Sequence, residues 1–136
     1  NRLTFLPETS STKDHLAEYN RIDIGLDTFP YHGTTTTFEA LWMGVPVVVL
    51  TGDRHASRVG TSILNSLDME NWTANDETQY INIAKEMANS TSDLRSQRSN
   101  LRKRMKNSIL MNHTAFAENF ENTIRQIWQE WCQTQS

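Results

Sequence analysis

The first half of the chain alternates short apolar runs with longer amphipathic stretches. The apolar runs predict strands at residues 3–6, 22–26, 45–50 and, more briefly, 72–73. The run at 45–50 is the clearest because every residue in it is apolar, as expected of a parallel strand covered on both faces. The stretches between the runs predict helices at residues 13–20, 35–43 and 56–67. Gly44 follows the second of these helices, where glycine commonly ends a helix.

The second half of the chain is predicted to be helical, with helices at residues 76–89, 93–106 and 114–132. Thr12 and Asn75 are expected to cap the helices that follow them. In the last helix apolar residues recur every three or four positions and predict a buried stripe, made of Phe116, Phe120, Ile124, Ile127, Trp128 and Trp131. Strands alternating with helices predict an α/β fold: a Rossmann-like parallel sheet flanked by helices, followed by a helical C-terminal segment. We expect residues 1–136 to form a single domain cut from a longer chain.

Charge and composition narrow the range of partners. The net charge of −3 disfavours nucleic acid as the main partner, and the basic residues at 95–106 are interpreted as a solvated helix face. The longest apolar run has six residues, against about 20 for a membrane span, so no membrane contact is expected. The single cysteine, Cys132, excludes an internal disulfide and a cysteine-based metal cage, and predicts a reducing, cytoplasmic location.

The loop after the second predicted strand carries the most specific chemistry. Residues 27–37 read DTFPYHGTTTT and lie where open parallel sheets bind ligands, beyond the carboxyl end of a strand. Gly33 lets the backbone approach a ligand closely. The threonines after it stand at a helix start, with its unpaired N–H groups and positive dipole end. Hydroxyls of Thr34, Thr35 and Thr36 would add donors, so the segment is predicted to bind an anion, most naturally phosphate.

These residues also have plainer interpretations. The threonines would serve only as caps, although one suffices for capping and four β-branched residues in a row disfavour a helix. Glu39, one turn further on, either accepts hydrogen bonds from ribose hydroxyls or complements the helix dipole. His15 and His32 are either structural or catalytic. No Walker lysine and no GxGxxG motif follows the loop, and no His or acidic pair has metal-ligand spacing, so no metal site is predicted.

A family resemblance is carried by residues 22–64, which read IDIGLDTFPYHGTTTTFEALWMGVPVVVLTGDRHASRVGTSIL. This stretch, about a third of the chain, closely resembles the O-linked N-acetylglucosamine transferase and Spindly-type glycosyltransferases, and most of all their bacterial members. The resemblance implies the GT-B architecture, in which two Rossmann-like halves enclose a cleft, and it implies that this chain is the C-terminal half. The parent is expected to carry helical repeats of about 34 residues upstream.

The resemblance also implies roles for the residues of the loop. The residues that match Thr34, Thr35 and Thr36 hold the diphosphate of a uridine diphosphate (UDP) sugar, beside the position of Gly33. The animal enzymes have His in place of Thr34, so direct help from that His to the leaving phosphate is absent here. The position of Glu39 binds ribose, and the animal enzymes use Asp there, which keeps the charge.

The resemblance implies a base-binding side as well. His15 matches a His near the uracil, and Ser10 falls near the loop whose backbone reads the base. The family has Lys and Arg where this chain has Thr12 and Glu18. Arg58 lies within the matching stretch and would either help to bind phosphate or form a buried ion pair. No residue is assigned as catalytic.

The implied function is transfer of a sugar, N-acetylglucosamine (GlcNAc) or glucose, from a UDP-sugar to a Ser, Thr or Asn of a protein. The UDP-sugar would bind this half, the protein acceptor would bind through the N-terminal half, and no metal cofactor is expected. Two alternatives stay open: half of a nucleotide-sugar epimerase, which shares the two-half fold, and a non-catalytic binding or scaffold module. The isolated fragment is expected to be inactive, because a GT-B site lies between two halves.

Overall fold

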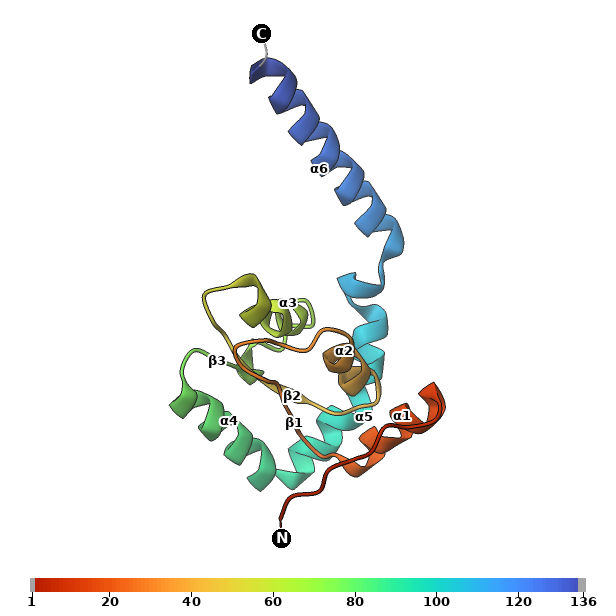
Figure 1. Cartoon of the computed structure of the whole chain (residues 1–136), viewed down its shortest axis with the longest axis vertical. Helices are drawn as coiled ribbons and strands as arrows, with labels where there is room; N and C mark the ends of the chain where they lie inside the picture. The colour runs from red at the N-terminus through yellow and green to blue at the C-terminus, as the bar shows by residue number, and fades with distance from the viewer. Residues whose placement is uncertain (1, 135–136) are drawn as a thin grey trace.

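The computed structural model describes residues 2–134 and has a small parallel sheet at its centre (Figure 1). The strand order is β1 (Gly25–Leu26), β2 (Val47–Leu50), β3 (Thr73–Ala74). Both neighbours pair with β2 in parallel, Gly25 opposite Val47 and Val49 opposite Thr73. The all-apolar run therefore forms the central strand, as predicted, and its valines are buried. Its strand begins two residues later than predicted, at Val47.

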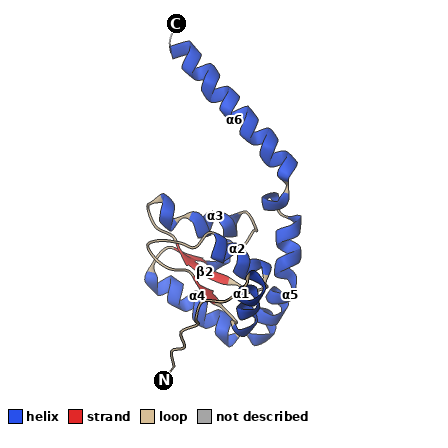
Figure 2. Cartoon of the chain, turned by 45° about the vertical axis from the view of Figure 1, so that its right-hand side comes forward, coloured by secondary structure: helices blue, strands red, loops and turns tan. Residues whose placement is uncertain are grey.

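The described residues form six α-helices: α1 (Thr12–Glu18), α2 (Thr35–Trp42), α3 (Val59–Asn65), α4 (Glu77–Asn89), α5 (Thr91–Asn107) and α6 (His113–Thr134). Short 3₁₀ turns connect some of them, at Tyr19–Arg21, His55–Ser57, Glu70–Trp72 and Ile109–Met111. Helices α2 and α3 lie on one side of the sheet and α4 on the other (Figures 1 and 2). This confirms the predicted parallel sheet flanked by helices.

The hydrophobic core lies between β2 and helices α2, α3 and α5. Its fully buried members include Leu41, Val49, Leu64 and Leu101. Burying one such side chain contributes roughly 1.5–3 kcal/mol, so this cluster fixes the helices against the sheet and holds the start of α2 in place.

Local signals place most helix ends within a few residues of prediction. Gly44 has φ 82° and follows α2, which confirms its predicted position after the helix. The caps of α1 and α4 are each one residue away from the predicted ones. Ser11 accepts a hydrogen bond from the Asp14 N–H, and Asp76 accepts one from Gln79. Each of these side-chain oxygens stands immediately before the first helical residue, where a cap must be.

The basic segment of α5 was predicted to be a solvated face, and all of its cations except the half-buried Arg98 are exposed. Three of them also contact other parts of the chain. Arg98 donates a hydrogen bond to the backbone carbonyl of Ile22, and Arg102 Nε donates one to the carbonyl of Trp42 at 2.7 Å. Arg102 and Lys106 also lie 5.5 and 5.6 Å from the centre of the Trp42 ring. The cations bind there because α2 ends at Trp42 with unpaired carbonyls and the negative end of its dipole.

Two predicted apolar elements do not pack in this chain. Residues 3–6 form no strand, and the Phe5 side chain is 90% exposed, because no described strand lies beside them to pair with. Helix α6 extends away from the rest of the molecule (Figure 1), so its predicted buried stripe is exposed, from 50% at Ile124 to 70% at Phe116. Of the helices in residues 2–134, none is both long and apolar enough to cross a membrane.

Candidate functional site

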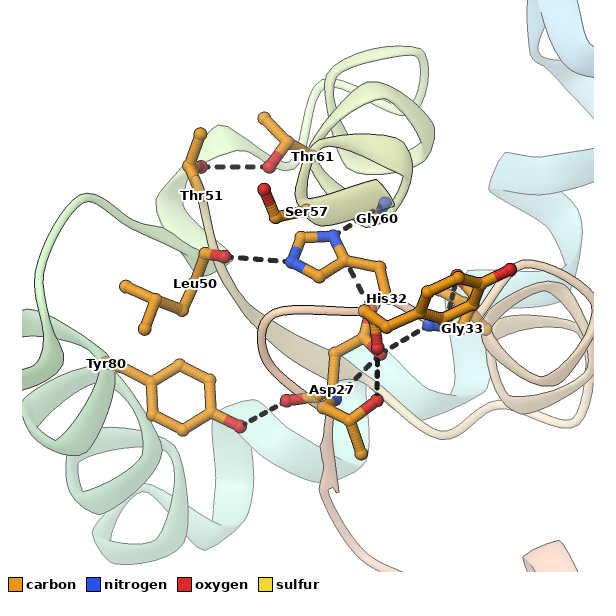
Figure 3. A network of polar contacts seen from close by, with 12 residues as sticks. Asp27, His32, Gly33, Leu50, Thr51, Ser57, Gly60, Thr61 and Tyr80 are labelled. Carbon is orange, nitrogen blue, oxygen red and sulfur yellow. Dashed lines mark hydrogen bonds and ion pairs between the residues drawn. The ribbon is translucent and has the colours of Figure 1, made fainter. Parts of the chain in front are cut away.

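The candidate site is the loop of residues 27–34, which joins the carboxyl end of β1 to the first turn of α2. The connection from β2 to α3, residues 51–58, comes to the same end of the sheet (Figure 3). Parallel sheets bind their ligands at this end. The predicted diphosphate, ribose and base residues are distributed along α1, the loop and α2.

The threonines at the start of α2 divide into two kinds. Thr34, Thr35 and Thr36 are exposed, and the structure shows no hydrogen-bond partner for their hydroxyls among the described residues. Thr34 is the residue before the helix, but its side chain makes no capping bond. Thr37 is buried, and its hydroxyl donates to the carbonyl of Gly33 at 3.0 Å. The capping interpretation is therefore wrong for the three exposed residues, whose hydroxyls make no capping bond at the first turn of α2.

Gly33 is required by close packing within the loop. A β-carbon at this position would overlap the hydroxyl oxygens of Thr36 and Thr37. The Gly33 N–H donates inward to Asp27 Oδ1 at 2.8 Å. The absence of a side chain at Gly33 therefore leaves room for the hydroxyls of Thr36 and Thr37. Its N–H group forms a hydrogen bond inside the loop.

A buried histidine joins this loop to the end of β2 and to the first turn of α3 (Figure 3). The ring of His32 is 1% exposed. Its Nε2 lies 2.8 Å from the carbonyl oxygen of Leu50, which only accepts, so Nε2 carries the proton. Its Nδ1 accepts a hydrogen bond from the N–H of Gly60 at 3.1 Å. These two bonds fix the neutral tautomer and give His32 a structural role, one of the two predicted for it.

Asp27 anchors the inner side of the same loop. Its Oδ1 accepts hydrogen bonds from the N–H groups of Thr28, at 2.9 Å, and Gly33. Its Oδ2 is buried without a hydrogen-bond partner among the described residues; it lies 4.0 Å from His32 Nδ1, whose lone pair is taken by Gly60. Burial, and then the charge of Asp27, raise the pKa of Tyr80, whose hydroxyl donates to the Asp27 carbonyl at 2.9 Å.

On the outer side, α1 and α2 bring three polar side chains together. His15 Nε2 lies 3.0 Å from Glu39 Oε2, and the Tyr19 hydroxyl lies 3.2 Å from the same oxygen. The Tyr19 hydroxyl is also 3.4 Å from the carbonyl of Thr36. Burial, followed by the charge of Glu39 and the hydrogen bond to it, raises the pKa of Tyr19 to about 12. The predicted base-binding His15 and ribose-binding Glu39 are thus neighbours.

The remaining predicted site residues lie at the edge of this arrangement. Ser10 is exposed, and its hydroxyl donates to Asp14 Oδ2 at 3.1 Å. Arg58 is exposed and donates to the carbonyl of Gly52 at 3.3 Å. It forms no ion pair within residues 2–134, so the buried ion pair is wrong as an alternative for Arg58. The same part of the chain contains no group of three His, Cys, Asp or Glu residues arranged around a metal position.

Sequence reasoning did not find Tyr19, Asp27 or Gly60 as parts of this arrangement. The contacts of Tyr19 with Glu39 and of His32 with Gly60 join residues 20 and 28 positions apart. No local pattern reports such pairs. A usable signal was the carboxylate of Asp27 directly at the end of a strand, six residues before the glycine that it binds.

Comparison with known proteins decides the family. Residues 1–120 match the profile of Glycosyl transferase family 41. The chain belongs to this family. The resemblance carried by residues 22–64 is therefore confirmed, and it extends over most of the chain.

Relatives within family 41 agree with this assignment. The chain is similar to the probable UDP-N-acetylglucosamine–peptide N-acetylglucosaminyltransferase SPINDLY of Solanum lycopersicum, with 40% identity over 96% of the chain and 14% of the relative. It is similar to the UDP-N-acetylglucosamine–peptide N-acetylglucosaminyltransferase of Caenorhabditis elegans, with 26% identity over 90% of the chain and 11% of the relative. The chain thus spans about a seventh or less of the length of these relatives.

A solved structure of the family supports the fold. The Thermobaculum terrenum O-GlcNAc transferase, solved as its K341M mutant, superposes with a TM-score of 0.83 and 36% sequence identity. The match covers 98% of this chain and 25% of that one. It confirms the predicted Rossmann-like α/β fold of a GT-B glycosyltransferase.

Proposed function

We propose that this family 41 chain is the donor-binding half of a protein glycosyltransferase, which moves GlcNAc or a related hexose from a UDP-sugar to a protein side chain. The observation that carries the proposal is the set of three exposed threonine hydroxyls at the start of α2, beside N–H groups that have no acceptor in the helix. The names of the relatives supply the donor and acceptor classes.

The proposed chemistry needs little from this half beyond binding and charge stabilisation. As the sugar leaves, negative charge grows on the diphosphate. The inner network holds the backbone of the loop that leads into α2, so the N–H groups of the first turn stabilise that charge without rearranging. The hydroxyls of Thr34, Thr35 and Thr36 add donors beside them. Glu39, half-buried beside His15, accepts hydrogen bonds from the ribose.

The acceptor and the second wall of the site belong to another part of the parent protein in this proposal. A groove of about 910 Å³ lies between residues 65–68 and α5 and does not include the site loop. The loop itself is open to solvent, which supports a cleft completed by a second half. We further propose a cytoplasmic enzyme, since its single cysteine suits a reducing compartment.

The test is a transfer assay with the full-length parent, a peptide acceptor and a panel of UDP-GlcNAc, UDP-glucose and a GDP-linked hexose. We expect transfer from at least one UDP-sugar. Transfer from the GDP-sugar alone would reject the uracil assignment, and no binding of any nucleotide sugar would favour a scaffold module. The isolated chain serves as the matched control and should show no turnover, because half of the site is absent.

Metal-free catalysis is part of the proposal and is tested in the same assay. The start of α2 supplies the positive charge that a divalent cation supplies in other transferases. Excess chelator should therefore leave the rate unchanged. Activity that disappears with chelator and returns with manganese would contradict this part of the proposal.

A further inference from the structure

Tyr19 occupies the junction between the base-binding and phosphate-binding sides of the proposed site. It begins the 3₁₀ turn directly after α1, and its ring reaches the first turns of α2. The hydroxyl lies 3.2 Å from Glu39 Oε2 and 3.4 Å from the Thr36 carbonyl, and both of these oxygens accept. The ring also meets His15 edge-on, with centroids 5.7 Å apart and planes at 88°.

The two oxygens of the Glu39 carboxylate are used unequally. His15 and Tyr19 both contact Oε2. The structure shows no hydrogen-bond partner of Oε1 within residues 2–134. The carboxylate of Glu39 is therefore anchored through one oxygen. The side chain is still 25% exposed and so remains accessible to a ligand.

We propose that Tyr19 is a positioning residue whose hydroxyl holds Glu39 so that Oε1 accepts hydrogen bonds from the ribose hydroxyls of the donor nucleotide. This inference rests on the proposed function, since it needs a nucleotide at the start of α2. Tyr19 itself acts through Glu39 and touches neither the sugar nor the diphosphate.

Tyr19 and His15 both anchor Glu39 Oε2, at 3.2 and 3.0 Å. A free glutamate samples several side-chain rotamers, and ordering such a side chain costs conformational entropy. Contact from Tyr19 orders it before the nucleotide arrives, which strengthens binding by preorganisation. The His15 side chain is 45% exposed, so its contact with Glu39 is open to water. The Tyr19 hydroxyl is protonated at neutral pH and donates, and its pKa of about 12 extends this into the alkaline range.

The experiment compares Tyr19→Phe with the unchanged full-length parent, using calorimetry with UDP and with 2′,3′-dideoxy-UDP. The substitution keeps the ring and removes one hydroxyl. We expect the affinity for UDP to fall about three- to tenfold, the range that one hydrogen bond supplies. The affinity for the dideoxy nucleotide should not change. In a Glu39→Gln background, the effect of Tyr19→Phe on UDP binding should shrink toward zero, because the charged acceptor is gone.

Tyr80→Phe is the matched control. It also removes a tyrosine hydroxyl that donates one bond, here to the backbone of Asp27 behind the loop. Any loss of affinity in this variant should be equal for the two nucleotides. An equal loss for both in Tyr19→Phe, or no loss, would overturn the inference while the proposed function stands. Failure of the unchanged parent to bind UDP would overturn both.

Discussion

The inner and outer sides of the loop between β1 and α2 use similar polar side chains in opposite ways. On the inner side Asp27, His32 and Thr37 are buried, and their hydrogen bonds go to the backbone of this loop and its neighbours. On the outer side Thr35 and Thr36 are exposed, and their hydroxyls have no hydrogen-bond partner among the described residues.

Adjacent threonines make the difference concrete. Thr36 and Thr37 are consecutive and chemically identical, yet only the hydroxyl of Thr37 has a partner in the protein. Each buried polar group that is left without a hydrogen bond costs about 1–3 kcal/mol. This cost explains why the buried side chains of the inner side bond to the backbone. The outer hydroxyls carry no such requirement, so the stability of the fold does not account for their arrangement.

The largest expected effect comes from breaking the inner side. His32→Ala opens a cavity and leaves the Leu50 carbonyl and the Gly60 N–H buried without partners. We expect the free energy of unfolding to fall by about 3–5 kcal/mol, measured by urea denaturation of the chain. His55→Ala is the control, since His55 is exposed and should change stability by less than about 0.5 kcal/mol. Equal stability of the two variants would show that His32 does not support the loop.

The second prediction separates the two sides with one kind of substitution. Changing both Thr35 and Thr36 to Val keeps the branched shape and removes two outer hydroxyls. Each lost bond to a charged group costs about 1.5–3 kcal/mol, so affinity for UDP in the full-length parent should fall roughly tenfold or more while stability stays unchanged.

Thr37→Val is the matched control for that pair. It removes a hydroxyl that bonds the Gly33 carbonyl, so it should lower the free energy of unfolding by about 1 kcal/mol. Calorimetry measures the affinity for UDP and denaturation measures the free energy of unfolding, so the two together distinguish a binding role from a structural one. A double variant that binds UDP with normal affinity would remove the diphosphate assignment from Thr35 and Thr36.

The sequence predicts the elements of this fold better than their packing. The central strand and the end of α2 follow from local features, an all-apolar run and Gly44, and both are confirmed. The strand at residues 3–6 and the buried stripe on α6 are wrong for a common reason. Apolar periodicity shows that a face suits burial, but it does not say what covers that face, and no described part of this chain covers either one.

The same contrast between local features and packing holds for the candidate site. The exposed threonines were predicted from a local argument, the excess of hydroxyls at a helix start. Tyr19 was missed because its role depends on a contact with Glu39, which lies on α2. The role of Asp27 was missed although its partner Gly33 lies in the same loop. The binding roles of Ser10, His15, Glu39 and Arg58 stay predictions until a nucleotide is tested.

The smallest expected effect concerns the alkaline stability of the outer side. The pKa of Tyr19 is raised from 10.0 to about 12 by burial and by Glu39. The folded state therefore holds this proton more tightly than the unfolded state does. The resulting stabilisation is fully present below pH 10 and is lost as the pH rises from 10 through about 12. Tyr19→Phe should make the decline of stability in this window shallower, although Tyr80, whose pKa is also raised, still contributes. Urea midpoints measured from about pH 8 to about pH 11.5 test this, with Tyr31→Phe as the control because the Tyr31 side chain is 74% exposed. Identical pH profiles for Tyr19→Phe and the unchanged chain would mean that Tyr19 ionises as freely in the folded state as in the unfolded state. The contact with Glu39 would then be too weak to hold that carboxylate in place.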